Sequence, residues 1–347
     1  MLEHGGNLGK AAMLHGIPVE QWLDLSTGIN PHGYPVPEIP ASLWQRLPLE
    51  NDGLLEAAKD YYQALHLLPT AGSQAAIQCL PRLRPPSRVQ ILGPTYAEHA
   101  RAWQQNGHQV QMVTGQDLPA AVLSDAVDVL VVCNPNNPTG RLIDTKTLLF
   151  WHQQLAARGG WLIVDEAFMD ATPEYSLAQY ALLPGLIVLR SLGKFFGLAG
   201  TRVGFVLAED QLLKQLQEQL GPWPINGASR FIATQALLDK AWQACTRDYL
   251  NQTSLQLQSL LNQYQLIPNG STTLFQWVLN EHAQRWQQHL AQNGIWVRYF
   301  DAGPGYSSSL RFGSLGFTVP GITTADKDKA INPNWERLEI ALSQFSI

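Results

Sequence analysis

Short apolar segments alternate with longer segments of mixed polarity between about residues 53 and 208. The apolar segments predict buried strands at 88–93, 127–134, 161–167 and 186–191. Amphipathic patterns predict helices at 54–65, 98–107 and 145–159. Strands joined by helices of this length form crossover connections, which predict a mostly parallel sheet. A further strand at 202–208 follows 186–191 after only a loop, so these two strands could pair antiparallel.

The two ends of the chain follow other patterns. Residues 1–40 are rich in Gly, Pro and Asn and predict loops with little regular structure. A long helical tract at about 228–265 predicts a bridge between domains. After it, short strands at 273–279, 295–300 and 309–313 and a helix predict a smaller α+β domain. We therefore expect an α/β protein with an N-terminal segment (1–40), a large domain (41–240) and a small C-terminal domain (241–347).

Composition and charge narrow the class of protein. The net charge of −5 and the absence of a Lys- or Arg-rich run argue against a nucleic-acid partner. The chain has three cysteines and no CxxC or Cys/His ligand spacing, which argues against a disulfide framework and against a metal site. No apolar segment approaches the ~18 residues that span a bilayer, and the first ten residues do not resemble a signal peptide. We expect a cytoplasmic protein without membrane contact.

Polar residues follow the predicted parallel strands at the points where these strands end. NPNNPTG (134–140) follows one strand, Asp165 ends another, and Ser191 and Lys194 follow a third. Ligands bind beyond the carboxyl ends of parallel strands. A charge in apolar surroundings is costly unless it is paired or chemically used, and Lys194 lies within LRSLGKFFGLAG. We interpret Lys194 as a functional amine that faces a shared crevice.

Each of these motifs also has a purely structural interpretation. The loop 134–140 could be a plain turn, and Asp165 could cap a helix. TAGSQAAIQCL (70–80) is a Gly-Ser turn that opens a helix and could bind a phosphate, but this signal is weak alone. Together, an amine, a carboxylate, an amide and a phosphate site match a phosphorylated pyridine aldehyde. The order Asn, Asp, Ser-x-x-Lys, Arg resembles the class I and II aminotransferases, which are fold-type I pyridoxal-phosphate enzymes.

This resemblance implies a three-layer large domain with a mostly parallel sheet, pyridoxal 5'-phosphate as the cofactor, and a role for each matching residue. Lys194 would form the Schiff base, Asp165 would hold the ring nitrogen, and Asn137 would contact the 3-oxygen. Tyr96 would stack on the ring, although core packing is the alternative. The phosphate would be held by Gly72, Ser73, Gln74, Ser191 and Arg202.

The N-terminal HGGN (4–7) and LDLSTGINPHG (23–33) resemble the threonine-phosphate decarboxylase group of cobalamin biosynthesis, which is related to histidinol-phosphate aminotransferases. That resemblance implies that Arg311 binds the substrate's α-carboxylate and Arg298 its phosphate. It also implies that the N-terminal segment covers the substrate. Its candidate substrate contacts, which could equally be loop-structuring residues, are His4, Asn7 and Asn30.

Two positions depart from the family pattern. Phe168 stands where aminotransferases usually have a Tyr that reaches the cofactor oxygen, so Asn137 would make that contact alone. Leu47 stands where many relatives have a Tyr that reaches the phosphate of the neighbouring subunit. The second departure leaves the expected homodimer in place but puts this cross-subunit contact in question.

Three functions are compatible with these residues. The preferred one is decarboxylation of L-threonine O-3-phosphate to (R)-1-aminopropan-2-yl phosphate. The second is transamination of an amino acid or amino phosphate such as histidinol phosphate. The third is a non-catalytic regulator that retains only the aminotransferase shape, and Lys194, Asp165 and the absence of a spare domain argue against it.

Overall fold

The computed structural model describes residues 4–114, 127–303, 306–316 and 333–345. The chain forms two compact units. One unit comprises residues 34–137 and 141–244, and the other comprises residues 1–33, 138–140 and 245–347.

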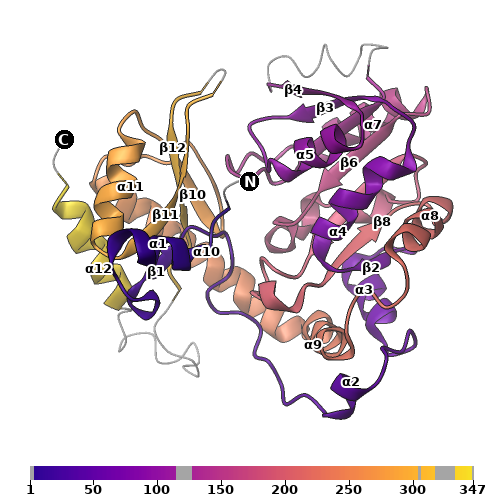
Figure 1. Cartoon of the computed structure of the whole chain (residues 1–347), viewed down its shortest axis with the longest axis horizontal. Coiled ribbons are helices and arrows are strands. Elements are labelled where there is room, and N and C mark those ends of the chain that lie inside the picture. Colours follow the sequence, from indigo (N-terminus) through magenta and orange to yellow (C-terminus); the bar gives the residue numbers. More distant parts are fainter. Residues whose placement is uncertain (1–3, 115–126, 304–305, 317–332, 346–347) are drawn as a thin grey trace. The chain divides into compact units, whose positions relative to one another are not determined.

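The first unit contains a seven-stranded sheet in the order β2-β8-β7-β6-β5-β3-β4 (Figure 1). Its strands are β2 (Leu68–Thr70), β3 (Arg88–Leu92), β4 (Gln109–Val113), β5 (Val129–Cys133), β6 (Trp161–Asp165), β7 (Leu186–Ser191) and β8 (Gly204–Leu207). Neighbours from β4 to β7 pair parallel, whereas β8 pairs antiparallel with both β7 and β2. The mostly parallel sheet and the antiparallel pairing of 202–208 are therefore confirmed.

Helices cover this sheet and bury its strands. The helices of this unit are α2 (Ser42–Gln45), α3 (Leu54–Tyr62), α4 (Gly72–Cys79), α5 (Glu98–Gln105), α7 (Thr145–Ala156), α8 (Asp210–Leu220) and α9 (Gly227–Leu238). Residues of α4, α5 and α8 pack in one core with alternate residues of the strands. All five residues of β5 are buried, which explains why this strand is a continuous apolar run instead of an alternating one.

The helical tract expected at 228–265 is not one helix. It consists of α9 and α10 (Lys240–Gln263), which are separated by Asp239. Asp239 has a non-helical backbone conformation, and its Oδ1 accepts a hydrogen bond from the Trp242 backbone at 2.9 Å. A carboxylate that caps the first turn in this way starts a new helix, so the predicted helical tract is present as two consecutive helices.

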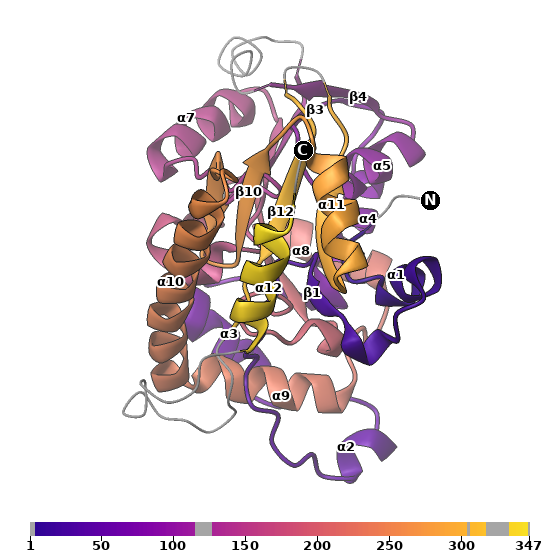
Figure 2. The ribbon, with the colours of Figure 1, turned by 90° about the vertical axis from the view of Figure 1, so that its left-hand side faces the viewer.

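The second unit is built on a five-stranded sheet in the order β1-β11-β12-β10-β9. The strands are β1 (Leu23–Leu25), β9 (Gly270–Thr272), β10 (Phe275–Leu279), β11 (Ile295–Phe300) and β12 (Ser309–Gly313). Residues of α10, α11 (Ala283–Gln292) and α12 (Pro333–Ser343) form one core with these strands, and Figure 2 shows the three helices over β10 and β12. The short strands and the helix expected after 265 are confirmed.

Residues 4–33 contain more regular structure than the sequence predicted. α1 (Leu8–His15) is capped by the Asn7 side chain and ends at Gly16, whose φ of 67° is left-handed. A 3-10 turn follows at Val19–Gln21, and β1 pairs parallel with β11. An eight-residue helix and a three-residue strand are too short to give a clear hydrophobic period, so the loop prediction was wrong here.

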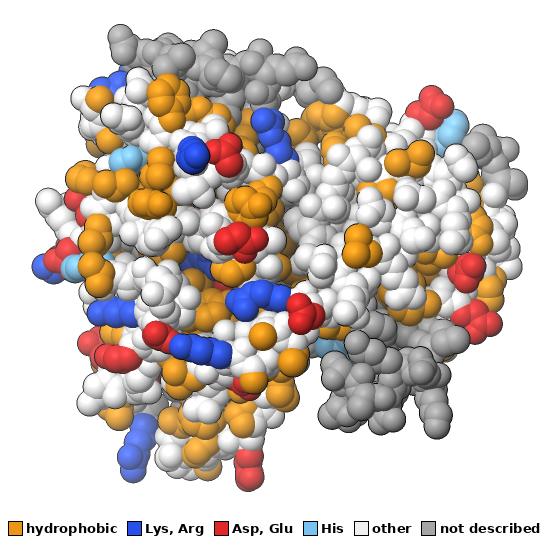
Figure 3. Space-filling model, turned by 180° about the vertical axis from the view of Figure 1, so that it is seen from behind, with side chains coloured by type: hydrophobic (Ala, Val, Ile, Leu, Met, Phe, Trp, Pro, Cys, Tyr) orange, Lys and Arg blue, Asp and Glu red, His pale blue; other side chains and the backbone are white. Residues whose placement is uncertain are grey.

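Charges of both signs are interspersed on the surface. Among the described residues on the face in Figure 3, Lys and Arg side chains lie beside Asp and Glu side chains. In the part of the chain that the structure describes, no helix is both long enough and apolar enough to cross a bilayer.

Candidate active site

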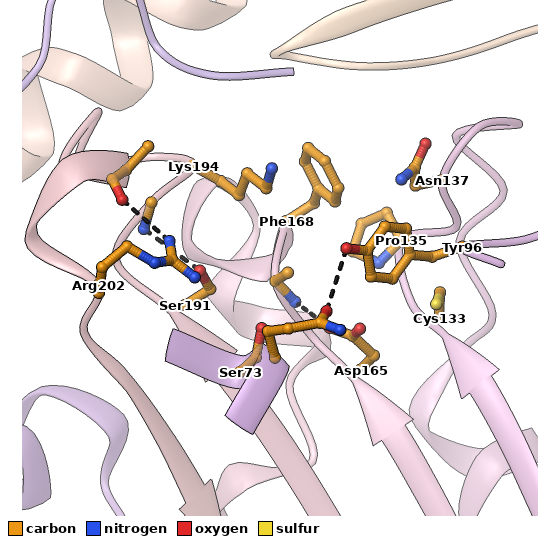
Figure 4. A pocket seen from close by; sticks show the side chains of 14 residues that line it. Ser73, Tyr96, Cys133, Pro135, Asn137, Asp165, Phe168, Ser191, Lys194 and Arg202 are labelled. Carbon is orange, nitrogen blue, oxygen red and sulfur yellow. Dashed lines mark hydrogen bonds between the residues drawn. The ribbon is translucent and has the colours of Figure 1, made fainter. Parts of the chain in front are cut away.

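The carboxyl ends of three adjacent parallel strands meet at one pocket of the first unit. β5 ends at Cys133, β6 at Asp165 and β7 at Ser191. In the sheet register, Cys133 is opposite Asp165, and Asp165 is opposite Leu189. The pocket beyond these ends has a volume of about 190 Å³ (Figure 4).

The pocket brings together most of the side chains that the sequence singled out in this unit. Those that line it are Ser73, Gln74, Tyr96, Asn137, Asp165, Ser191, Lys194 and Arg202. Gly72 does not line the pocket but lies against it, because a Cβ at Gly72 would be 2.6 Å from Nη2 of Arg202. These residues come from segments more than one hundred positions apart, so the sheet topology is what assembles them.

Asp165 is buried with a histidine behind it. Its Oδ2 lies 2.9 Å from Nε2 of His99, and its Oδ1 accepts a hydrogen bond from the Ala167 backbone at 3.1 Å. Burial by itself would lower the pKa of His99, but the neighbouring Cys133 and Asp165 outweigh burial and raise this pKa to about 10. His99 is therefore an imidazolium near neutral pH, and its Nε2 is within hydrogen-bond distance of the Asp165 carboxylate.

Lys194 reaches into the pocket from the loop after β7. Its Nζ lies 5.4 Å from the centroid of the Phe168 ring. Phe168 is buried and lines the pocket, so the ammonium faces an aromatic ring where the family pattern has a phenol. Figure 4 shows the amine end of Lys194 pointing towards the pocket interior.

One end of the pocket is suited to an anion. α4 begins at Gly72 and Ser73, and the first N–H groups of a helix lack intrahelical acceptors. Arg202, with a left-handed φ of 53°, places its guanidinium beside this helix start and donates to the Ala199 carbonyl at 2.9 Å. The Ser191 hydroxyl also lines this region and accepts a hydrogen bond from the Gly193 backbone at 3.3 Å.

The loop after β5 is held by two of its asparagines. Asn134 exchanges two hydrogen bonds with the Ile143 backbone, at 2.8 and 3.0 Å. Asn136 accepts from the Thr95 hydroxyl and donates to the Pro94 carbonyl, both at 2.8 Å. The side chains of Asn134 and Asn136 are thus committed to the loop, while Asn137 lines the pocket.

A buried ion-pair network lies next to the strand ends. Arg190, which precedes Ser191, contacts Glu166 at 2.6 Å and also Asp170. Glu166 follows Asp165 directly and accepts two further hydrogen bonds, from the Leu177 backbone and the Ser176 hydroxyl. Because these groups are buried and mutually paired, they fix the ends of β6 and β7 relative to each other.

In the second unit, Arg298 and Arg311 are directly opposite each other on the antiparallel strands β11 and β12. Arg311 is buried and donates from Nη2 to the Ser26 carbonyl at 2.7 Å. Burial, and then the charge of Arg298, lower the pKa of Arg311 to about 10. The charge of Asp24 acts in the opposite direction and raises this pKa. Two like charges opposite each other on a sheet are unfavourable, so this pair is suited to an anionic ligand.

The N-terminal candidates belong to the same unit. The Asn7 side chain caps α1, and Asn30 is buried and accepts a hydrogen bond from the His32 backbone at 2.9 Å. His4 is exposed. The Gly6 backbone donates to the Ser26 hydroxyl at 2.7 Å, which links the HGGN segment to the residue whose carbonyl binds Arg311.

Two residues of the pocket region were not found from the sequence. His99 is the second residue of α5 and lies three positions after Tyr96, a spacing that could have placed both on one side of the start of this helix. Cys133 is the last residue of β5, and its thiol lies within 4.8 Å of donor atoms of both His99 and Asp165. Neither role is visible without the strand order.

The fold and this pocket define a class of protein. A model of the family "Aminotransferase class I and II" matches residues 48–332, so the chain belongs to this family. It is 48% identical to a threonine-phosphate decarboxylase of Pseudomonas aeruginosa, over 99% of this chain and 98% of that protein.

Solved structures share the fold. A histidinol-phosphate aminotransferase of Sinorhizobium meliloti, crystallised with pyridoxal-5'-phosphate, superposes with a TM-score of 0.78 and 18% identity, over 99% of this chain and 97% of that one. An L-threonine-O-3-phosphate decarboxylase of Porphyromonas gingivalis also has this fold, with a TM-score of 0.74, 19% identity and 92% and 98% coverage.

The match to this family confirms the predicted fold and the predicted cofactor, pyridoxal 5'-phosphate, and the residues present fit this cofactor. The pocket offers an amine on Lys194, a carboxylate on Asp165 and a glycine-lined helix start beside Arg202. The helix start lies close to β8 because Gly204 lacks a side chain: a Cβ there would be 2.5 Å from the Ser73 backbone nitrogen. The donor set matches an aldehyde, a basic ring nitrogen and a phosphate.

Proposed function

We propose that this protein decarboxylates L-threonine O-3-phosphate and releases (R)-1-aminopropan-2-yl phosphate and CO2, as a step of cobalamin biosynthesis. The 48% identity to a threonine-phosphate decarboxylase over nearly the whole chain supports this reaction. The bound cofactor supplies an electron sink for the bond that breaks at Cα. The remaining work falls to side chains of the chain itself.

In this proposal the Asp165 carboxylate would hold a proton on the ring nitrogen of the cofactor, and His99, whose Nε2 lies 2.9 Å from Oδ2 of Asp165, would orient that carboxylate. Lys194 would hold the cofactor covalently in the absence of substrate, and its Nζ, once displaced by the amine of the substrate, would donate the proton that replaces CO2 at Cα. Asn137 would donate to the 3-oxygen, and the Tyr96 ring would pack against the cofactor ring. The start of α4, with Gly72, Ser73 and Gln74, would bind the phosphate together with Ser191 and Arg202.

The observation that carries the substrate assignment is the cross-strand pair of Arg298 and Arg311. Two guanidinium groups side by side suit a ligand with two anionic groups at a fixed separation, such as a carboxylate and a phosphate on one amino acid. We assign the α-carboxylate to Arg311, which is held by Ser26, and the phosphate to Arg298. Residues 1–40, with His4, Asn7 and Asn30, would cover this substrate.

We also propose that the protein is a homodimer that acts in the cytoplasm. The segment around α2 exposes large apolar side chains, with Trp44, Leu47 and Leu49 each more than 60% exposed. A second copy of the chain would remove this surface from water, and Leu47 would contribute apolar contact where relatives carry a Tyr. Sedimentation velocity should give a dimer, and a stable and active monomer would contradict it.

The decisive experiment is product analysis. Purified protein loaded with cofactor is incubated with L-threonine O-3-phosphate, with and without 2-oxoglutarate, and the products are identified by mass spectrometry. Decarboxylation predicts release of CO2 and the aminopropanol phosphate without any 2-oxo acid. Products that form only with 2-oxoglutarate would instead establish transamination.

A further inference from the structure

Three residues around Tyr96 form a chain of hydrogen bonds that the function above does not use. The Tyr96 hydroxyl donates to Oε1 of Gln74 at 3.1 Å, and Nε2 of Gln74 donates to Oε2 of Glu98 at 3.3 Å. Figure 4 shows the bond from the Tyr96 hydroxyl as a dashed line. The chain connects the first turn of α4, the loop before α5 and the first turn of α5.

The charge of Glu98 fixes the direction of this chain. An ionised carboxylate only accepts hydrogen bonds, so the NH2 group of the Gln74 amide must face Glu98. The amide oxygen then faces Tyr96, and the phenol must donate to it. The Tyr96 hydroxyl is therefore engaged with Gln74, and what Tyr96 offers the pocket is its ring.

The Tyr96 ring is constrained at a second point. It contacts the His99 ring edge-on, with centroids 6.1 Å apart and an interplanar angle of 84°. A ring held at its hydroxyl and at its edge has few remaining orientations, because rotation about the Cα–Cβ bond would break the bond to Gln74. His99 is in turn held by Asp165.

We propose that Gln74 and Glu98 are positioning residues, which set the angle at which the Tyr96 ring lies against the cofactor ring. This inference rests on the proposed function, since it requires a cofactor in the pocket. The backbone and the side chain of Gln74 then have different roles. The backbone N–H belongs to the helix start that would bind the phosphate, whereas the side chain positions Tyr96. The amide oxygen of Gln74 and one of its two N–H donors are engaged by Tyr96 and Glu98, so only one N–H of the side chain remains for another ligand.

A double-mutant cycle tests this division. Apo-protein is titrated with pyridoxal 5'-phosphate, and the affinity and the circular dichroism of the cofactor's visible band are measured for wild type, Gln74→Ala, Tyr96→Phe and the double variant. We expect each single variant to bind about three- to tenfold more weakly, the range for one hydrogen bond, and to have a smaller dichroic band. The double variant should be no weaker than either single variant, because both changes break the same bond.

Glu98 provides a matched pair of variants. Glu98→Gln retains an oxygen that can accept from Nε2 of Gln74, so its dichroic band should equal that of wild type. Glu98→Ala removes the acceptor, so it should reduce the band, and it should have no effect in the Tyr96→Phe background. Dichroism of the bound cofactor reports the surroundings of its ring, and a change in global stability alone would not move it.

Two results would overturn the proposal. Additive losses for Gln74→Ala and Tyr96→Phe would mean that the Gln74 side chain acts on the cofactor independently of Tyr96. Wild-type affinity and dichroism in Gln74→Ala would mean that the Gln74 side chain has no influence on the bound cofactor. If Gln74→Ala fails to fold, Gln74→Met, of similar length, replaces it. Wild-type protein that takes up no cofactor at all would refute the proposed function as well, and this result is distinct from the other two.

Discussion

His99 and Asp165 form a buried pair, with Nε2 of His99 2.9 Å from Oδ2 of Asp165. Neither side chain is more than 7% exposed. Burial of a charged pair is tolerated only when each charge has its partner, and here the imidazolium and the carboxylate satisfy each other. The pair places a carboxylate in a pocket that Ser191, Lys194 and Arg202 also line.

The charge of His99 should be visible in the pH dependence of stability. The pKa of His99 in the folded protein is raised to about 10, above the ordinary value of 6.5. A raised pKa contributes stability that is fully present below the unfolded pKa and is lost as pH rises through the folded one. The melting temperature of the apo-protein should therefore decrease between pH 6.5 and 10 more steeply for wild type than for His99→Gln. Equal slopes would show that His99 is neutral in the folded state.

Asp165→Asn should retain the cofactor but lose most of its turnover. An amide is of the same size as the carboxylate but cannot hold a proton on the ring nitrogen. The measurements are cofactor content by absorbance and kcat with L-threonine O-3-phosphate. Near-normal kcat would mean that Asp165 is only the partner of His99.

Lys194 should carry the covalent link to the cofactor. The isolated protein should be yellow, should lose this colour on treatment with borohydride, and should then carry a phosphopyridoxyl mass on Lys194. Lys194→Ala should reduce kcat by more than about a thousandfold with little change in melting temperature, since it removes the reacting amine. Colourless protein that stays apo in excess cofactor would refute the assignment.

Gly204 should be indispensable for the phosphate end of the pocket. A Cβ at this position would lie 2.5 Å from the Ser73 nitrogen and 2.8 Å from the Arg190 carbonyl oxygen, and both are backbone atoms that cannot rotate away. Gly204→Ala should destabilise the protein by about 1–3 kcal/mol, measured by urea unfolding, and should weaken cofactor binding. Gly200→Ala is the matched control, because a Cβ at Gly200 meets nothing within 4 Å. Equal behaviour of the two variants would contradict the close approach of α4 to β8.

The sequence predicted those parts of the site that lie at the ends of continuous apolar strands. Asp165, Ser191 and Lys194 follow such strands directly, so their common edge could be inferred from the parallel sheet alone. His99 could not be found in this way. It lies on α5, beyond β3, and it meets Asp165 on β6 only because β5 lies between β3 and β6, an order that no local pattern contains.

The same physical limit applies to the parts of the fold that were missed. α1 and β1 are too short for a periodic signal, and they are ordered by tertiary contacts such as the pairing of β1 with β11. The break at Asp239 depends on one side-chain hydrogen bond within a tract of good helix formers. By contrast, 295–300 and 309–313 were predicted with the bounds that β11 and β12 have, because both strands are short apolar runs bounded by turn residues.

Arg298 and Arg311 provide the last prediction, because they lie opposite each other on β11 and β12 but have different surroundings. Arg311 is buried and bonded to the Ser26 carbonyl, whereas Arg298 is only partly buried, over the Phe300 ring at 5.3 Å. If Arg298 binds the phosphate, Arg298→Ala should weaken the binding of L-threonine O-3-phosphate by about 2–5 kcal/mol. The poor binding of unphosphorylated threonine should remain nearly unchanged. Arg311→Ala should weaken the binding of both ligands by the same amount.

The free protein supplies an independent readout for the same pair. The charge of Arg298 contributes to lowering the pKa of Arg311, after burial, so the two guanidinium groups repel each other, and the charge of Asp24 offsets part of this effect on Arg311. Arg298→Ala should therefore leave the ligand-free protein at least as stable as wild type while it lowers the affinity for L-threonine O-3-phosphate. Arg298→Lys keeps a point charge but loses the two-pronged guanidinium, so its affinity for this ligand should lie between those of wild type and Arg298→Ala. A surface arginine that only paired with an acidic neighbour would behave differently: its loss would cost little and would affect both ligands equally. If Arg298→Ala lost the same affinity for threonine as for L-threonine O-3-phosphate, the main residue-level support for a phosphorylated substrate would be removed.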